Sequence, residues 1–413
     1  MRSAMPTKAE RKQLEGAVSA FHSHYASSRN WGAERWDNTL YQALAQPTCY
    51  ALLVNLFAPR SRLEDLLRKS QIPTSQLRQV KLPVLNLPKL EVPLSQLILY
   101  EHLSQNDSES ANEKTESTDQ ELEAKFLFPP PAPIPSRADR SKSLLSHWNM
   151  DAASGLAAYM LAVRPGDRVL DLCAAPGGKS VSLAQLLFPQ KHADFHLPTG
   201  DGTQANAPVT GCLHSNEVDV SRNKRLAANL RSYIPGCLFE EGHVKVLRLD
   251  GTDSKALQQL PLGPGGYDKV LLDAPCSSER HIIHAYDKAS SVGRIAEEMA
   301  RWRPGSSRNL AKVQAALLMT ALRAARTGGR VVYSTCSIES GENDGVIRKV
   351  LDLLEKERRK YGLKWKLQFG TETDEALDKL TEVTEFGRIA LPDHKSGAKW
   401  GPLYFCVITK IGA

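Results

Sequence analysis

From about residue 150 to the C-terminus, short apolar runs of strand length alternate with longer stretches that carry apolar residues at helical spacing. The runs predict β-strands at residues 168–172, 211–216, 244–249, 268–273, 329–334 and 403–409. The longer stretches predict helices at residues 151–163, 179–187, 221–233, 309–326 and 341–357. This alternation predicts an α/β fold with a mostly parallel, doubly wound sheet that has helices on both faces.

The first hundred residues follow a different pattern. Residues from about 8 to 70 are predicted to be helical, because apolar side chains recur at three- and four-residue spacing, beginning with Leu14, Val18, Phe21 and Tyr25. Within residues 71–103, short apolar pieces lie around Pro83, Pro88 and Pro93 and are expected to be strands or extended connections. Residues 1–103 are therefore expected to form a smaller, mostly helical N-terminal region.

Two polar stretches separate or interrupt these patterns. Residues 104–125 are poor in apolar side chains and rich in Ser, Glu, Asn and Thr, a composition typical of a disordered insertion. The proline-rich residues 128–135 are expected to be extended, so that 104–135 forms an acidic insertion with a linker ahead of a domain spanning 136–413. Residues 188–210, with Pro, Gly, His and Asn, are interpreted as a surface-loop insertion.

Composition narrows the class of protein. The 413 residues carry a net charge of +7, and residues 104–125 alone contribute −5, which leaves +12 on the rest and is compatible with a polyanionic partner. No run of eighteen apolar residues occurs, so no membrane span is expected. The seven cysteines are odd in number and form no CxxC pair, which argues against a disulfide framework or a structural zinc site and favours a reducing compartment.

Two of the cysteines directly follow predicted buried strands. Cys276 ends the sequence Asp-Ala-Pro-Cys at 273–276, and Cys336 lies in Tyr-Ser-Thr-Cys-Ser at 333–337. The carboxyl ends of strands in open α/β sheets border the ligand cleft. The sixty or so residues between the two motifs are enough for a helical crossover between neighbouring parallel strands. The two thiols are therefore predicted to face one cleft.

A glycine-rich turn at 171–179, Asp-Leu-Cys-Ala-Ala-Pro-Gly-Gly-Lys, joins a predicted strand to a helix and suggests a nucleotide cofactor. A phosphate-binding loop would need glycine where Cys173 stands, and the dinucleotide pattern GxGxxG is absent. S-adenosylmethionine (SAM) remains. In that class an acid after the second strand binds the ribose hydroxyls, which fits Glu217, and Asp250 after the third strand is placed to meet the adenine. A single such acid is also compatible with an ordinary capping role.

With these motifs the chain resembles the Nop/Sun family of RNA cytosine-5 methyltransferases over roughly residues 140–413. The residues that carry the resemblance lie at 150–154, 173–179, 250–251, 273–277, 333–337 and 342–343. Weaker signals at 276–284 and 401–406 point to a mitochondrial ribosomal-RNA member. The chain departs from that member in its two insertions and in having Glu rather than Asp at 217, a change that keeps the carboxylate.

The resemblance implies a Rossmann-like SAM-dependent methyltransferase domain, RNA as substrate, and no metal or membrane. The catalytic residues implied are Cys336, Cys276, Asp273 and Lys179. The residues implied to bind the cofactor are Cys173, Ala174, Ala175, Pro176, Gly177, Gly178, Lys179, Glu217, Arg222, Asp250, Gly251 and Asp273.

The chemistry explains the need for a thiol. Carbon 5 of cytosine becomes nucleophilic once a thiolate adds to carbon 6, and a base must later remove the carbon 5 proton so that the thiolate can leave. A free cysteine is only about 3% thiolate at pH 7, so help is expected from Lys179 and from the positive charge of the cofactor. Asp273 is placed to hold the exocyclic amine of cytosine. Spacing does not tell which thiol attacks; by resemblance, Cys336 is the nucleophile and Cys276 assists release.

The region between the two cysteine motifs is rich in basic residues. Those expected to follow RNA phosphates are Arg280, Arg294, Arg301, Arg303 and Arg308. Trp302 among them is equally compatible with stacking on a base and with packing between helices. Because the target base must leave any stack to reach the cleft, a single-stranded or loosely paired RNA site is expected.

Several substrates and roles fit this pattern. Ribosomal RNA is the leading substrate and transfer RNA the alternative, with a protein partner for targeting also compatible. A non-catalytic RNA-binding assembly factor on the same scaffold is disfavoured because Cys276, Cys336, Lys179 and Asp273 are all intact. A DNA methyltransferase is disfavoured because the Thr-Cys thiol would then have no role. Residues 1–13 carry four basic side chains but are short for a transit peptide, so the expected mitochondrial location rests on the resemblance.

Overall fold

The structure is a computed structural model of the whole chain. It describes residues 7–70, 72, 74–85, 96–102, 128–135, 143–194, 209–263, 265–370, 375–396 and 398–412. The insertion predicted at 104–125 lies outside the described residues, and so does most of the loop predicted at 188–210.

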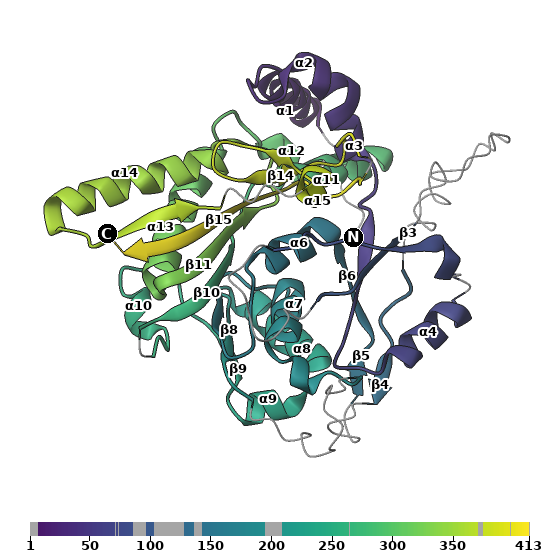
Figure 1. Cartoon of the computed structure of the whole chain (residues 1–413). Coiled ribbons are helices and arrows are strands. Elements are labelled where there is room, and N and C mark those ends of the chain that lie inside the picture. The colour runs from purple at the N-terminus through teal and green to yellow at the C-terminus, as the bar shows by residue number, and fades with distance from the viewer. Residues whose placement is uncertain are drawn as a thin grey trace.

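A large mixed sheet forms the centre of the described part of the chain, with strand order β13-β14-β15-β11-β10-β7-β8-β9 and β12 paired to β15 (Figure 1). Its parallel strands are β7 (Arg168–Asp171), β8 (Cys212–Asn216), β9 (Val244–Leu247), β10 (Tyr267–Asp273) and β11 (Ala325–Thr335). These confirm the strands predicted for this region. The antiparallel strands are β12 (Trp365–Phe369), β13 (Glu382–Val383), β14 (Arg388–Ala390) and β15 (Leu403–Gly412).

Helices cover both faces of this sheet, as the alternating pattern predicted (Figure 1). One face is covered by α6 (Ala152–Met160), α7 (Gly178–Leu187) and α8 (Val220–Tyr233). The other face is covered by α10 (Ala256–Gln259), α13 (Ser307–Ala324) and α14 (Asp344–Tyr361). Strand β10 shows the two-residue period: Leu271 packs into the first core, while Val270 and Leu272 pack into the second.

The N-terminal region combines helices with a second, smaller sheet. The helices predicted over 8–70 are present as α1 (Lys8–Ala26), α2 (Gly32–Arg35), α3 (Tyr41–Ala45) and α4 (Arg60–Lys69). The prediction was wrong at β1 (Tyr50–Val54), which interrupts them. The small antiparallel sheet has the order β2 (Leu77–Gln79), β3 (Leu99–His102), β1 and β6 (His147–Asp151). Pairing between segments a hundred residues apart overrides the local pattern at β1.

Strand β6 joins the small sheet to the part of the chain that forms the large mixed sheet. It pairs with β1 over five residues, and its last residue, Asp151, accepts a hydrogen bond from the Ala153 N–H and so begins α6. Strand β6 lies after the domain boundary expected near residue 136, yet it completes the N-terminal sheet. The boundary itself stays a prediction.

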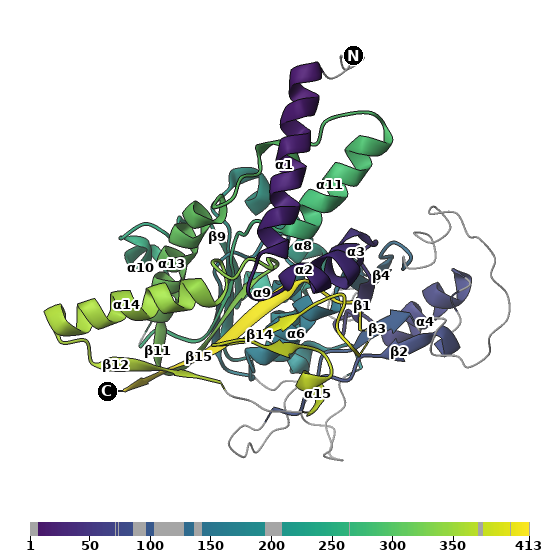
Figure 2. The same ribbon diagram turned by 90° about the horizontal axis from the view of Figure 1, so that it is seen from above.

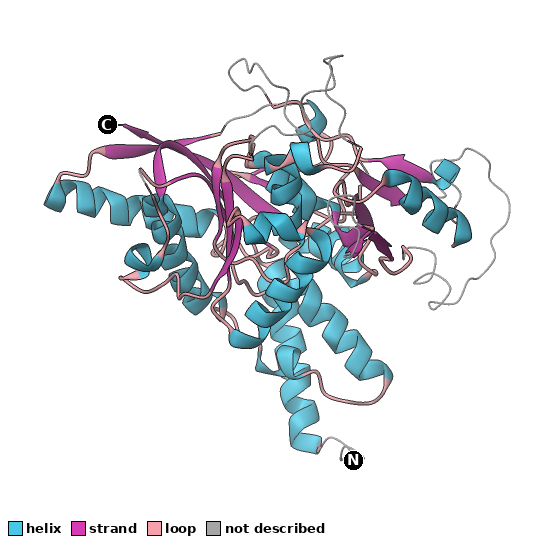
Figure 3. Ribbon diagram, turned by 90° about the horizontal axis from the view of Figure 1, so that it is seen from below, coloured by secondary structure: helices cyan, strands magenta, loops and turns pink. Residues whose placement is uncertain are grey.

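Four further α-helices and one hairpin belong to the described chain, besides a π-helix at Trp36–Leu40 and 3-10 turns at Thr74–Gln76 and Pro189–Lys191. The helices are α9 (Gly236–Glu240), α11 (Glu279–Ser291), α12 (Glu297–Arg301) and α15 (Glu375–Asp378). A small hairpin consists of β4 (Pro133–Pro135) and β5 (Ser143–Leu145). Both α1 and α11 project from the body of the molecule when it is seen from above and below (Figures 2 and 3). In the described residues, no helix has the length and apolar character that crossing a bilayer requires.

The base of α1 packs against the second core through an aromatic cluster. Phe21 meets the Trp302 ring edge-on at 5.1 Å, and Tyr25 stacks on Trp36 at 4.9 Å. Trp302 is only 7% exposed. The interpretation of Trp302 as a helix-packing residue is therefore confirmed, and its alternative role in stacking on a base is wrong, because the ring is enclosed by α1.

Candidate active site

Two thiols in contact mark the centre of the site. Strands β10 and β11 are parallel neighbours, with Asp273 paired in register to Ser334, so the loops that follow them leave the sheet side by side. Cys276 and Cys336 lie in these two loops, and their Sγ atoms are 3.1 Å apart. The predicted meeting of the two thiols thus follows from strand adjacency.

The surroundings of the two thiols are electrically unequal. The hydrogen bond between the two thiols lowers the pKa of Cys336 against the effect of burial. A contact with Ser278 and the Lys179 ammonium lower this pKa further, whereas the Asp273 carboxylate opposes them. The same bond raises the pKa of Cys276, and so do burial and the negative charges of Cys336, Glu279 and Glu342. Cys336 is therefore the thiol that the site favours as thiolate, and Cys276 the one that keeps its proton.

An ion pair lies next to the thiols. The Lys179 ammonium donates to Asp273 Oδ2 at 2.7 Å and to the Ser154 hydroxyl at 3.1 Å, and Asp273 Oδ1 accepts from the Ser334 hydroxyl at 2.8 Å. Burial lowers the pKa of Lys179, but the Asp273 carboxylate outweighs it, so that the pKa is raised overall. Lys179 is thus held as a cation whose charge also reaches Cys336.

A pocket of about 210 Å³ lies beside this ion pair. The predicted cofactor residues that line it are Cys173, Ala174, Ala175, Pro176, Gly178, Lys179 and Asp273. Its other walls come from Asp171 and from residues 148–150 and 154. Sequence reasoning missed Trp148, Asn149 and Asp171 as lining residues; for Asp171, the position directly before the turn was an available signal.

The glycine turn has no room for larger residues. Gly177 has φ +122°, a conformation that residues with a Cβ rarely adopt, and a Cβ on Gly178 would lie 2.7 Å from Trp148 Nε1. The turn is tied to the next strand by the Ala174 N–H, which donates to the Asn216 carbonyl at 2.8 Å. The absence of a Cβ at Gly178 therefore lets Trp148 of β6 pack directly against the turn.

Asp171 is the most unusual group in the pocket wall. The Ser180 hydroxyl donates to Asp171 Oδ2 at 2.6 Å, whereas Oδ1 is buried and has no hydrogen-bond partner among the described residues. Burial raises the pKa of Asp171 to about 7. Burial also raises the pKa of Cys173, which keeps that lining thiol neutral. A buried polar oxygen without a partner in a pocket wall is suited to receive a ligand donor.

The other predicted cofactor residues lie outside the lining of this pocket. Glu217 is buried at the end of β8 and accepts from the Asp219 N–H at 3.0 Å. Arg222 Nη2 lies 3.3 Å from Glu217 Oε2 and donates to the Ala175 carbonyl at 3.3 Å, so it links the acid to the turn.

The prediction for the third strand end is only partly reflected in the structure. Asp250 is exposed and accepts from the N–H and the hydroxyl of Thr252 at 2.8 and 2.7 Å, as a turn residue does. Gly251 is buried, and a Cβ there would lie 2.8 Å from Leu317 Cδ2. The adenine contact of Asp250 stays a prediction, and the absence of a Cβ at Gly251 lets Leu317 of α13 pack closely against it.

The arginines expected to follow RNA phosphates divide into two groups. Arg280 is buried and donates to the carbonyls of Gly401 and Gln46, so its predicted phosphate contact is wrong: the guanidinium joins the N-terminal region to the body instead. Those that are exposed are Arg294, Arg301, Arg303 and Arg308. Within the described ranges, no group of three or more His, Cys, Asp or Glu residues has the geometry of a metal site.

Known proteins share this sequence pattern. Residues 203–370 match the family described as 16S rRNA methyltransferase RsmB/F. The chain is 33% identical over 299 residues to the mitochondrial tRNA (cytosine(34)-C(5))-methyltransferase of Danio rerio, an alignment that covers 69% of this chain and 66% of that protein. It is 31% identical over 277 residues to the 5-cytosine rRNA methyltransferase NSUN4 of Bos taurus, covering 66% and 61%. The chain spans less than two thirds of these relatives.

The fold is shared with a solved structure. NSun6 from Pyrococcus horikoshii, solved with SFG, matches with a TM-score of 0.53 at 18% identity, over 95% of this chain and 98% of that one. The sequence matches and the shared fold thus point to the same kind of protein as the two cysteine motifs and the glycine turn. Over the aligned residues the chain is similar to RNA cytosine-5 methyltransferases, as the resemblance to the Nop/Sun family implied.

Proposed function

We propose that the protein is a SAM-dependent methyltransferase that forms 5-methylcytosine in RNA. The observation that carries the proposal is the contact of 3.1 Å between the Cys276 and Cys336 thiols, beside the Lys179–Asp273 ion pair. A binding protein without chemistry has no need for a thiol that its surroundings favour as thiolate. The family relationship supports the same activity.

The cofactor site fits SAM in its chemistry. The backbone of Cys173–Lys179 would contact the bound cofactor, and the Asp171 oxygen without a partner would accept a hydrogen bond from it. The Glu217 carboxylate would accept hydrogen bonds from the ribose hydroxyls. Bound SAM supplies an electrophilic methyl group. We expect Glu217→Ala to weaken SAM binding measured by calorimetry by about tenfold or more, in line with the loss of a charged hydrogen-bond partner. Equal affinity of the variant would overturn the assignment of the ribose site.

The side chains around the thiols account for each step on the base. Cys336, as thiolate, forms a bond to carbon 6 of cytosine, while Asp273 holds the exocyclic amine and Lys179 keeps a positive charge nearby. Carbon 5 is then able to take the methyl group. A base then takes the carbon 5 proton, the electron pair of that C–H bond re-forms the double bond between carbons 5 and 6, and the bond between carbon 6 and Cys336 breaks with its electron pair returning to sulfur. Cys276 assists this release.

We propose ribosomal RNA in mitochondria as the substrate and transfer RNA as the second candidate. Relatives named for each substrate match at 31% and 33% identity, and the first named for tRNA is also named mitochondrial. A partner protein that presents the RNA is compatible with either. The exposed arginines of residues 294–308 would contact RNA phosphates.

Bisulfite sequencing of RNA from cells with and without the gene tests the function. We expect one or a few cytosines in mitochondrial ribosomal RNA to lose methylation when the gene is deleted, and to regain it with the wild-type gene but not with Cys336→Ala. Loss confined to transfer RNA would establish the second candidate. Unchanged methylation in both RNA classes would overturn the proposed activity.

A further inference from the structure

Two buried glutamates accept hydrogen bonds between the two loops that carry the thiols. Glu279 belongs to the loop of Cys276 and begins α11, whereas Glu342 belongs to the loop of Cys336 and precedes α14. Both side chains are fully buried at 0% exposure. Each one binds the loop that carries the other cysteine.

Glu342 holds the loop of Cys276. Its Oε2 accepts from the Ser277 N–H at 3.0 Å and from the Gln314 side-chain amide at 2.8 Å. The same Gln314 amide, on α13, donates to the Pro275 carbonyl at 2.8 Å. The residues on both sides of Cys276 are therefore fixed through one carboxylate and one amide.

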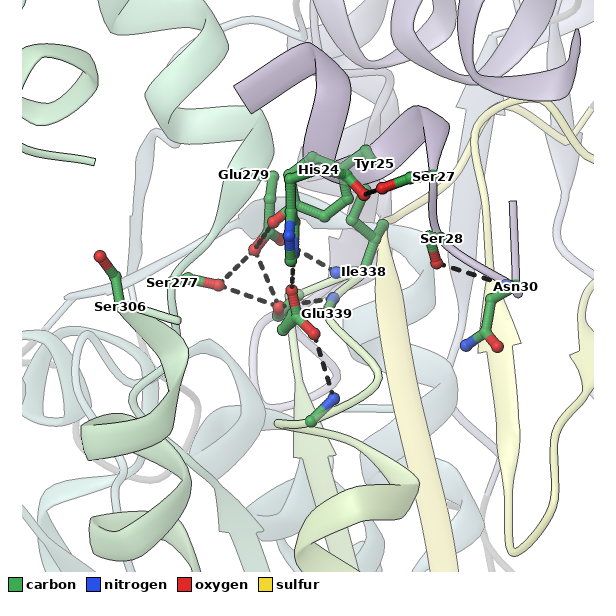
Figure 4. Close-up of polar contacts among 12 residues, drawn as sticks. His24, Tyr25, Ser27, Ser28, Asn30, Ser277, Glu279, Ser306, Ile338 and Glu339 are labelled. Atoms are coloured by element: carbon green, nitrogen blue, oxygen red, sulfur yellow. Dashed lines mark hydrogen bonds and ion pairs between the residues drawn. The ribbon is translucent and has the colours of Figure 1, made fainter. Parts of the chain in front are cut away.

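Glu279 holds the loop of Cys336 in the reciprocal way (Figure 4). Its Oε2 accepts from the Ile338 N–H at 2.9 Å, and its Oε1 accepts from the Ser337 hydroxyl at 3.1 Å. The Ser277 hydroxyl also donates to Oε1. The two residues directly after Cys336 are thus bound to the first residue of α11.

Helix α1, in the N-terminal region, also contacts Glu279 and the loop of Cys336 (Figure 4). The Tyr25 hydroxyl donates to Glu279 Oε1 at 3.0 Å, and His24 Nε2 lies 2.7 Å from Glu339 Oε2 in the loop of Cys336. Sequence far from the catalytic motifs therefore completes the contacts of Glu279.

We propose that Glu279 and Glu342 are positioning residues that hold the Cys276 and Cys336 thiols in contact by crossed hydrogen bonds, and that Tyr25 supports Glu279 from helix α1. Burying two carboxylates in one small region is unfavourable, and several donors are needed to offset it. Hydrophobic residues could fill the same space and stabilise the fold, but they could not bind backbone N–H groups of two separate loops. The consequence for methyl transfer rests on the proposed function.

The chain allows matched variants. In Glu342, both donors bind Oε2, and Oε1 has no hydrogen-bond partner among the described residues. Glu342→Gln can therefore keep both bonds while it removes the charge, whereas Glu342→Ala removes the bonds. Glu279 uses both oxygens, so Glu279→Gln keeps only part of its contacts and Glu279→Ala none. Asp344→Asn is the control, because this buried acid binds the 384–386 turn and Tyr404 rather than a thiol loop.

The first measurement needs neither RNA nor SAM. Diamide takes one hydrogen from each thiol and is reduced to its hydrazine while the Cys276–Cys336 disulfide forms, and mass spectrometry of the joined peptides gives the rate. We expect Glu279→Ala and Glu342→Ala to slow this reaction about tenfold, since proximity sets its rate. Glu342→Gln and Asp344→Asn should stay within about twofold of wild type, with Tyr25→Phe and Glu279→Gln between these limits.

The second measurement is methyl transfer to an RNA substrate. The alanine variants should lower kcat with little change in KM, and Glu342→Gln should restore most of it. Thermal melting identifies any variant that does not fold. If an alanine variant does not fold, Tyr25→Phe still tests the support of Glu279, because it removes only the hydroxyl and keeps the ring in the aromatic cluster. Wild-type disulfide rates in folded Glu279→Ala and Glu342→Ala would overturn the inference. Fast disulfide formation in a wild-type protein without RNA methylation would overturn only the proposed function.

Discussion

At the scale of single residues, the two thiols differ in pKa because of the hydrogen bond that they share and the charges that surround them. The hydrogen bond between them raises the pKa of Cys276, which burial and the Glu279 and Glu342 carboxylates raise further, and it lowers the pKa of Cys336, as Lys179 also does. The sequence motifs are similar, since each is a cysteine in a loop after a strand, and only the surroundings give them different roles. The difference agrees with the assignment of Cys336 as nucleophile.

Replacing each cysteine separates attack from release. We expect Cys336→Ala to abolish methyl transfer and any covalent RNA adduct, because no thiolate remains to add to carbon 6. Cys276→Ala should still attack and methylate, then accumulate a protein–RNA complex that survives denaturing gels, since proton removal from carbon 5 is a separate step. An adduct trapped by Cys336→Ala and absent with Cys276→Ala would reverse the two roles.

The reactivity of Cys336 should depend on its neighbour. Because the Cys276 thiol lowers the pKa of Cys336, Cys276→Ala should raise that pKa and move the pH profile of Cys336 alkylation by iodoacetamide to higher pH. Each unit of the move lowers the thiolate fraction near neutral pH about tenfold. The control is Cys237→Ala, which removes a thiol on α9 and should leave the Cys336 profile unchanged. An unchanged profile in Cys276→Ala would contradict the hydrogen bond as its cause.

At the scale of elements, the site is assembled at the ends of neighbouring strands. The loops after β10 and β11 provide the thiols, the turn between β7 and α7 provides the pocket floor, and β6 provides a wall through Trp148. Strand β6 itself belongs to the small N-terminal sheet. The pocket is therefore completed by an element outside the parallel sheet.

A substitution in the turn should show how closely these elements fit. In Gly178→Ala the new Cβ would lie 2.7 Å from Trp148 Nε1, so β6 or the turn must shift. We expect SAM affinity measured by calorimetry to fall about tenfold, while helix formation itself is not harmed by alanine. Gly16→Ala in α1 is the control, because a Cβ there meets no atom within 4 Å among the described residues. Wild-type SAM affinity in Gly178→Ala would show that this wall does not shape the cofactor site.

At the scale of the whole molecule, the N-terminal region and the catalytic part are joined by polar contacts at several points. Arg280 donates to the carbonyls of Gln46 and Gly401, and Tyr25 binds Glu279. The Arg35 guanidinium pairs with Glu382 and Asp393 near the C-terminal strands. The N-terminal helices therefore act as part of the catalytic body.

The acidic stretch at 104–125 is expected to contribute little to that body. Its composition offers few apolar side chains for a core, so we expect its deletion to leave the midpoint of thermal unfolding within a few degrees and methyl transfer nearly intact. A deletion of the same kind in a packed segment, such as residues 50–54, should abolish folding. A large loss of stability after removing 104–125 would show it to be structural.

The sequence alone determined the α/β class, the strands from β7 to β11, the glycine turn and the two cysteine motifs, because these depend on local periodicity and on short-range motifs. Tertiary structure decided the rest. Strand β1 forms only because β6 and β3 pair with it, and Arg280 and Trp302 turn inward because α1 and α3 cover them. The unequal thiols and the crossed contacts of Glu279 and Glu342 depend on distances between loops sixty residues apart, which no local pattern encodes.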